Sequence, residues 1–76
     1  MAEHDRIRWR CRRGLLELDL VLDRFLARRF DGLDGELVQR FDELLDEADN
    51  DLLDLALGRA EPAPRYRAIV EMLRAG

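Results

Sequence analysis

Leucine and phenylalanine recur at every third or fourth position after Gly14, which is the spacing of one face of an α-helix. Between residues 15 and 30 this stripe consists of Leu15, Leu18, Leu22, Phe25 and Leu26. No stretch alternates apolar and polar residues as a half-buried strand does, and β-branched residues are few. The spacing therefore predicts an all-α fold.

Short breaks in this spacing divide the chain into helices. They are Gly14, "DGLDG" at 31–35, "ADND" at 48–51 and "EPAP" at 61–64. Glycine and Asp-Gly pairs supply turn conformations, and proline suits a first helical turn. We expect helices over about 5–12, 15–30, 36–48 and 50–57, and a last one after the prolines. With 76 residues, the chain is expected to form a single domain over 1–76, a small bundle of four to five helices.

Caps and faces follow from the same pattern. Asp34 is the expected N-cap of the third helix, Asp49 or Asn50 that of the fourth, and Gly58 follows the end of the fourth helix. The third helix is expected to bury Leu37, Phe41, Leu44, Leu45 and Ala48, with Glu43, Asp46 and Glu47 facing water. The last helix is expected to bury Tyr66, Ile69, Val70 and Leu73.

Charge is distributed unevenly along the chain. All 13 basic residues are arginine. Residues 1–13, the basic head, hold five arginines and two acidic residues for a net charge of +3. Residues 14–76 hold eight arginines and fifteen acidic residues for a net charge of −7. The arginines of the head, with Trp9, could bind nucleic acid, but the acidic remainder would repel a phosphate backbone, so no nucleic-acid partner is expected.

The apolar runs are far shorter than the roughly 20 residues of a membrane-spanning helix. The first residues carry Glu3 and Asp5 and no apolar stretch typical of a secretory signal. We therefore expect a cytoplasmic protein without direct membrane insertion.

The sequence offers no catalytic constellation. Cys11 lies one helical turn after Ile7 and is expected in the core, and His4 is expected in a frayed, solvated terminus. The acidic stretch 46–54 lacks the glycine and the bidentate acid of an EF-hand loop. We predict no catalytic residue, no metal site and no enzyme activity.

Glu17 is the one charged residue in a leucine-rich stretch whose position calls for explanation. At 100° per residue it points about 120° away from the stripe that builds the core, with Leu20 and Val21 flanking it. A glutamate in a first turn also complements the helix dipole. Two interpretations stand at this point: a local helix cap, or an interface in which Gly14 lets a partner's backbone come close beside Arg13 and Glu17.

The segment "RIRWRCRRGLLELD" resembles the signature of the FAD assembly factors of succinate dehydrogenase, the SdhE family. Its hallmark, Arg-Gly-x-x-Glu, is matched by Arg13, Gly14 and Glu17. The surroundings match as well, with Trp9 before the motif, Cys11-Arg12 directly ahead and Leu18-Asp19 directly behind. Looser similarity extends over nearly the whole chain, through "F-x-x-L-L" at 41–45 and the acids around Asn50.

The resemblance implies a five-helix factor that promotes covalent attachment of FAD to the flavoprotein subunit of succinate dehydrogenase, and of fumarate reductase where that exists. The flavin bond would form to a histidine of that client, so FAD is not expected to bind stably to this chain. Partner contacts would come from Arg13, Gly14, Glu17, Arg12, Arg8 and Trp9. A generic helical adaptor, or an antitoxin opposing a membrane toxin as the same family has also been described, is the alternative.

Overall fold

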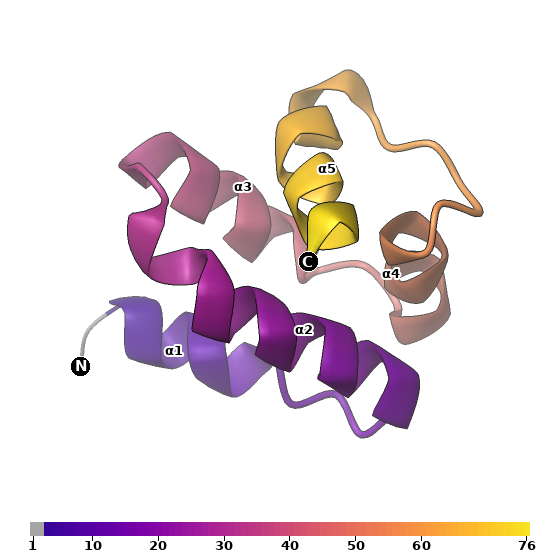
Figure 1. Ribbon diagram of the computed structural model, residues 1–76, viewed down its shortest axis with the longest axis horizontal. Helices are drawn as coiled ribbons and strands as arrows, with labels where there is room; N and C mark the ends of the chain where they lie inside the picture. The colour runs from indigo at the N-terminus through magenta and orange to yellow at the C-terminus, as the bar shows by residue number, and fades with distance from the viewer. Residues whose placement is uncertain (1–2) are drawn as a thin grey trace.

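The computed structural model describes residues 3–76, and within this range the chain forms helices and turns without a strand (Figure 1). The α-helices are α1 (Glu3–Arg10), α2 (Leu16–Arg28), α3 (Gly35–Leu44), α4 (Asp49–Ala56) and α5 (Arg67–Ala75). Two 3₁₀ turns, η1 (Phe30–Gly32) and η2 (Pro64–Tyr66), precede α3 and α5. The predicted all-α bundle of four to five helices is confirmed.

The longest helix, α2, packs against elements from both the middle and the end of the chain. It packs against η1, α4 and α5, while α3 packs against α5 and η2. Figure 1 shows α1 and α2 along the lower half of the molecule, with α3 and α5 above them and α4 to the right. The buried face of α2 carries Leu18, Leu22, Phe25 and Leu26, as the spacing predicted. Its opposite face is therefore free to serve another purpose.

Three phenylalanines form the centre of the core. The ring centroids of Phe25 and Phe41 lie 4.8 Å apart, those of Phe30 and Phe41 lie 5.8 Å apart, and all three side chains are fully buried. Tilted rings at these separations attract each other beyond the effect of area burial. Because Phe30 follows the end of α2 directly, its burial bends the chain into η1 and determines where α3 begins.

Glycine and aspartate end and begin helices where the sequence indicated. Gly14 has a φ of +82° and Gly58 a φ of +80°, a left-handed conformation that costs glycine nothing. The Asp34 carboxylate accepts a hydrogen bond of 2.9 Å from the Leu37 N–H, which confirms Asp34 as the N-cap of α3. The turns thus follow from local chemistry.

The bounds of the first two helices differ from the prediction. Helix α1 begins at Glu3 and ends at Arg10, so His4 lies within it and its ring stands 4.7 Å from that of Phe30. The expected fraying was therefore wrong at this residue, whereas the His4 side chain is exposed to solvent as expected. Helix α2 ends at Arg28, and Leu15, expected in the core stripe, is its half-buried N-cap.

The third and fourth helices also depart from expectation. Helix α3 ends at Leu44 rather than Ala48; Leu45, buried as predicted, is its C-cap. Ala48 is exposed and is the N-cap of α4 without a side-chain cap, so the predicted caps at Asp49 and Asn50 were wrong. Glu43 was expected to face water but is half-buried and accepts a 3.3 Å hydrogen bond from the Tyr66 hydroxyl.

Replacing the central aromatic should remove most of the stability of so small a domain. We expect Phe41→Ala to lower the free energy of unfolding by about 3–5 kcal/mol, because it deletes two ring contacts and leaves a cavity. Urea unfolding monitored by circular dichroism measures this loss. Leu20→Ala, at a side chain 60% exposed, is the control and should change stability by less than about 0.5 kcal/mol. Equal losses in the two variants would contradict the assignment of the core.

Candidate functional site: the Arg-Gly loop and its supports

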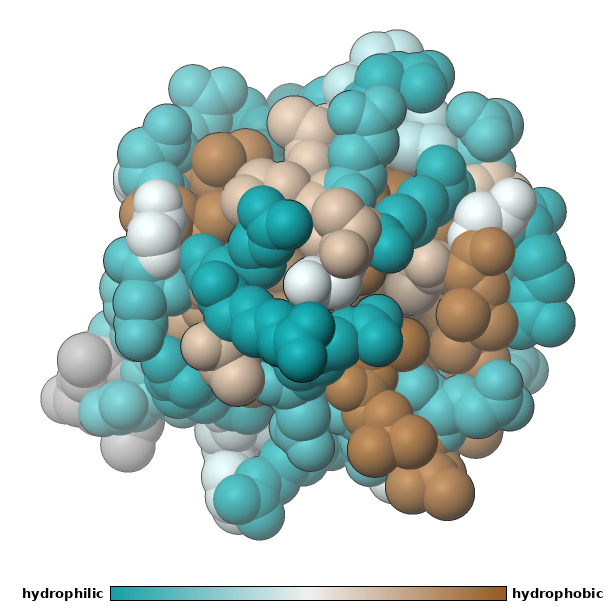
Figure 2. Space-filling view, viewed as in Figure 1, coloured by the Kyte–Doolittle hydropathy of each residue, from teal (hydrophilic) through white to brown (hydrophobic). Residues whose placement is uncertain are grey.

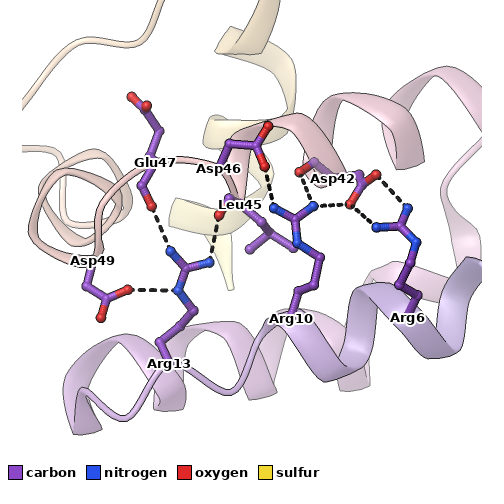
Figure 3. Close-up of polar contacts among 8 residues, drawn as sticks. All are labelled: Arg6, Arg10, Arg13, Asp42, Leu45, Asp46, Glu47 and Asp49. Atoms are coloured by element: carbon purple, nitrogen blue, oxygen red, sulfur yellow. Dashed lines mark hydrogen bonds and ion pairs between the residues drawn. The ribbon is translucent and has the colours of Figure 1, made fainter.

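Three arginines of the basic head face three aspartates across the molecule (Figure 3). We call this set the arginine ladder; its members are Arg6, Arg10, Arg13, Asp42, Asp46 and Asp49. Each arginine pairs with the aspartate 36 positions further along the chain. Both rows have the same spacing of four and then three residues, so the two segments run alongside each other in the same direction.

Asp42 on α3 is the shared member of the arginine ladder. Its carboxylate accepts a 2.7 Å hydrogen bond from Arg6 and a second bond from Arg10, which also reaches Asp46. The hydrogen bond from Arg6 is the main reason that the pKa of Asp42 lies below its usual value; burial opposes this effect, and Arg10 adds to it. The ladder is therefore a connected network rather than a set of isolated surface pairs.

Arg13, at the last rung, is turned into the molecule. Its side chain is only 15% exposed. Its guanidinium donates three hydrogen bonds, from Nη1 to the Leu45 carbonyl (2.7 Å), from Nη2 to the Glu47 carbonyl (2.7 Å) and from Nε to Asp49 Oδ1 (2.8 Å). Leu45 is the C-cap of α3, so the cation also satisfies carbonyls that a helix end leaves without partners.

Asp19 on α2 holds the main chain of the same loop. Its carboxylate accepts hydrogen bonds from the Arg13 N–H (3.0 Å) and from the Gly14 N–H (3.2 Å). Gly14 itself is exposed, and a Cβ placed on it would meet nothing within 4 Å. The loop is thus fixed from beneath and open above.

The first turn of α2 continues this open surface. Glu17 is exposed there, as its angular position predicted. Leu16 and Leu20, one helical turn apart, are 73% and 60% exposed. Figure 2 shows apolar side chains standing out over the first half of α2, at the lower right of the view. A charged group therefore lies beside apolar groups that the fold does not cover.

The remaining residues named from the sequence lie along α1 and the loop after it. Trp9 is 70% exposed, and the Arg12 guanidinium stands 5.1 Å from the centroid of its ring. Arg8 stands 5.2 Å from the Phe30 ring and forms a 3.0 Å ion pair with Asp31. Trp9 thus lies on the surface rather than in the core.

Two surface hollows bring most of these residues together. The first is lined by Cys11, Arg12, Gly14, Asp19 and Asp23, and the second by Asp5, Arg8, Trp9, Arg12, Asp23 and Leu26. Arg12 and Asp23 border both. Glu17 lines neither hollow. The motif therefore presents a continuous face from α1 to Gly14, with Glu17 at the start of the next helix.

Three observations limit the other chemistry of the described residues. Cys11 is buried, as expected, and its burial raises the pKa of its thiol to about 12, so the thiol is protonated at neutral pH. Among residues 3–76 no three His, Cys, Asp or Glu side chains are grouped to hold a metal ion. None of the helices described here is long and apolar enough to span a bilayer.

Sequence reasoning missed the supports of the loop. Asp46 was expected to face water, Asp49 was a candidate helix cap, Asp19 belonged to the motif's surroundings and Asp42 had no assigned role, whereas the fold uses all four to hold the head and its loop. Four of the five head arginines are engaged by acids of the same chain, which leaves less positive surface for a phosphate backbone than the sequence suggested. The matched spacing of the two charge rows was the signal that could have indicated their pairing.

The lowered pKa of Asp42 makes stability depend on pH. Its folded pKa lies below the unfolded value of about 3.9, so its contribution is complete above that value and is lost as the pH falls through the folded pKa. We expect Asp42→Asn to cost about 1 kcal/mol at pH 7 and progressively less below about pH 4, measured by urea unfolding. A cost for Asp42→Asn that stays constant from pH 7 to pH 2.5 would contradict this.

Comparison with known proteins places the chain in a family. A family model described as "Flavinator of succinate dehydrogenase" matches residues 5–76. The FAD assembly factor SdhE of Legionella pneumophila (strain Lens) is 42% identical over 72 residues, which cover 95% of this chain and 91% of that protein. The FAD assembly factor SdhE of Ralstonia nicotianae is 43% identical over 75 residues, with 92% and 79% covered. That of Pseudomonas aeruginosa is 42% identical over 73 residues, with 95% and 87% covered. No solved structure matches the chain. The chain belongs to the family of succinate dehydrogenase flavinators, the FAD assembly factors.

Proposed function

We propose that this chain promotes covalent attachment of FAD to the flavoprotein subunit of succinate dehydrogenase, and of fumarate reductase in cells that have it. It does so by binding that subunit through the motif surface, which consists of Arg8, Trp9, Arg12, Gly14 and Glu17 and is held in place by Arg13. The observation that carries the proposal is that Gly14 and Glu17 are both exposed, next to a loop fixed from beneath, in a chain of this family.

Gly14 suits the close approach of another protein. It has no side chain, its φ of +82° is held by the hydrogen bond to Asp19, and the space above it is open. A partner's backbone can therefore reach the loop without displacing any atom of this chain. Because the geometry exists before binding, little conformational entropy is lost when the partner docks.

Glu17 supplies charge and its neighbours supply apolar area. Within residues 3–76 the Glu17 side chain forms no hydrogen bond or ion pair, so its carboxylate is free to accept from a partner's donor. Leu16, Leu20 and Trp9 are each at least 60% exposed around the motif surface. A partner that covers these side chains would remove apolar area from water and strengthen the charged contact at its centre.

The factor's part in the reaction is that of a chaperone and not of a catalyst. The flavin bond forms to a histidine of the client, and FAD is attached there rather than held by this chain. The chain stabilises the client in a conformation in which it attaches its own flavin. We place this binding in the cytoplasm.

The direct experiment mixes the purified chain with apo flavoprotein subunit, FAD and a dicarboxylate. Covalent flavin is then read as in-gel fluorescence of the client band after denaturing electrophoresis. Acceleration of labelling by the chain supports the proposal. With a client shown to be competent, unchanged labelling would refute it and would favour the adaptor or antitoxin alternatives, which bind a partner without altering flavin content.

Removing the carboxylate of the motif should affect this activity alone. We expect Glu17→Ala to lower the rate of client flavinylation at least tenfold at a limiting factor concentration, with a small change in melting temperature. The matched control is Glu36→Ala, because Glu36 is also an exposed glutamate in a first helical turn and supports the dipole of α3 equally. Equal loss of activity in both variants, or a large loss of stability in Glu17→Ala alone, would identify Glu17 as a helix cap.

Bulk at Gly14 should block the partner. We expect Gly14→Arg to abolish the acceleration of flavinylation while circular dichroism shows a folded protein. Gly58→Arg is the matched control, because Gly58 is also exposed and has a φ of +80°. An arginine introduced there would bear the same left-handed strain of about 1–2 kcal/mol as one at position 14. If Gly58→Arg loses activity to the same degree, strain and not steric exclusion explains the effect.

A further inference from the structure

We propose that Arg13 is a positioning residue of the motif: it anchors the Gly14 loop to the turn between α3 and α4, and its neighbours make the client contacts. This inference deepens the proposed function and rests on it for its link to flavinylation. An arginine in a recognition motif is ordinarily expected to reach the partner, whereas the fold gives this one an internal task.

The donors of Arg13 are already engaged. A guanidinium carries five N–H groups, and three of those of Arg13 are spent on Leu45, Glu47 and Asp49 (Figure 3). Each of the three guanidinium nitrogens therefore already donates one hydrogen bond within the chain. To present those nitrogens to a client, Arg13 would have to break three bonds and leave Asp49 and two carbonyls unpaired, which is unfavourable.

The main chain of Arg13 is held as well. Its N–H and that of Gly14 both donate to Asp19 on α2. Arg13 thus connects α2 through its backbone with the turn between α3 and α4 through its side chain. Movement of Gly14 relative to the rest of the bundle requires the loss of one or both connections, so the open geometry of the loop depends on this residue.

The residues on either side show the opposite orientation. Arg12 is exposed, with its guanidinium 5.1 Å from the Trp9 ring centroid, and Gly14 is exposed with open space above it. Arg12 and Gly14 therefore face solvent, whereas the Arg13 side chain between them faces the protein interior. Arg12 is the cation of this loop that a client can reach, and Arg13 is the one that sets where Gly14 stands.

The geometry also explains why the residue is arginine. Its targets are the Leu45 carbonyl at the C-cap of α3, the Glu47 carbonyl in the turn and the Asp49 carboxylate at the start of α4. A planar fork reaches all three at once, whereas a lysine ammonium is a single compact charge on a flexible stem. Lysine at position 13 should keep the charge and lose the connection, which distinguishes anchoring from attraction.

A double-mutant cycle with Asp49 tests the proposal. Arg13→Gln, Asp49→Asn and the double variant are titrated against apo flavoprotein subunit, and the half-saturating factor concentration is read separately from the maximal rate. We expect each single change to raise the half-saturating concentration several-fold, and the double variant to be no worse than Arg13→Gln. Arg59→Gln, which removes the exposed ion pair with Asp54 outside the arginine ladder, should leave the half-saturating concentration unchanged.

A second readout needs no client. Amide hydrogen exchange of Gly14, followed by NMR, should become at least tenfold faster in Arg13→Gln and in Arg13→Lys, while the Phe41 amide in the core keeps its protection. Unchanged exchange at Gly14 would overturn the proposal. The proposal would also be overturned if Asp49→Asn left the half-saturating concentration unchanged and the effects of the two substitutions were additive. In that case Arg13 would act by contacting the client itself. If the wild-type chain fails to accelerate flavinylation, the proposed function fails, and the exchange of Gly14 alone decides whether Arg13 is the anchor.

Discussion

The arginine ladder is the interaction on which the rest of this structure depends. Helix α1 has only eight residues, too few to be stable in isolation. Ile7 on α1 and Cys11 just after it are buried against the core, but burial of apolar side chains does not specify the position of the helix along its neighbours. The matched rows of charges specify that position, because only one register of the arginines against the aspartates forms all three pairs. A single exposed pair contributes less than about 1 kcal/mol, and the network gains by sharing Asp42.

That register determines the functional face. With α1 fixed along α3, its last turn delivers the chain to the point where Arg13 meets the carbonyls beyond α3. The main chain then meets Asp19 on α2, and Gly14 is left exposed between them. The face offered to a partner thus combines an open backbone, the Glu17 carboxylate and uncovered apolar side chains. Stability and recognition are divided between adjacent residues of one motif.

Sequence patterns predicted much of this fold. Apolar spacing identified the helices, and the φ values of Gly14 and Gly58 and the Asp34 cap appeared where turn chemistry indicated. The failures lie around residues 43–49, which were read as a continuous acidic helix end. There Arg13 donates hydrogen bonds to the Leu45 carbonyl and to Asp49, which hold the turn between α3 and α4. Local propensity does not contain these contacts, because the arginine lies more than 30 residues earlier in the sequence.

The sequence by itself determined the helical class, the faces that build the core and the residues of the motif, because these depend on spacing and on backbone preferences over a few neighbours. The tertiary structure alone decided that Trp9 faces solvent and that Arg13 faces inward between exposed neighbours. It also decided that acids which look like a solvated surface hold the basic head. Pairing across 36 residues depends on how helices pack, and one-dimensional periodicity does not encode which helix face meets which.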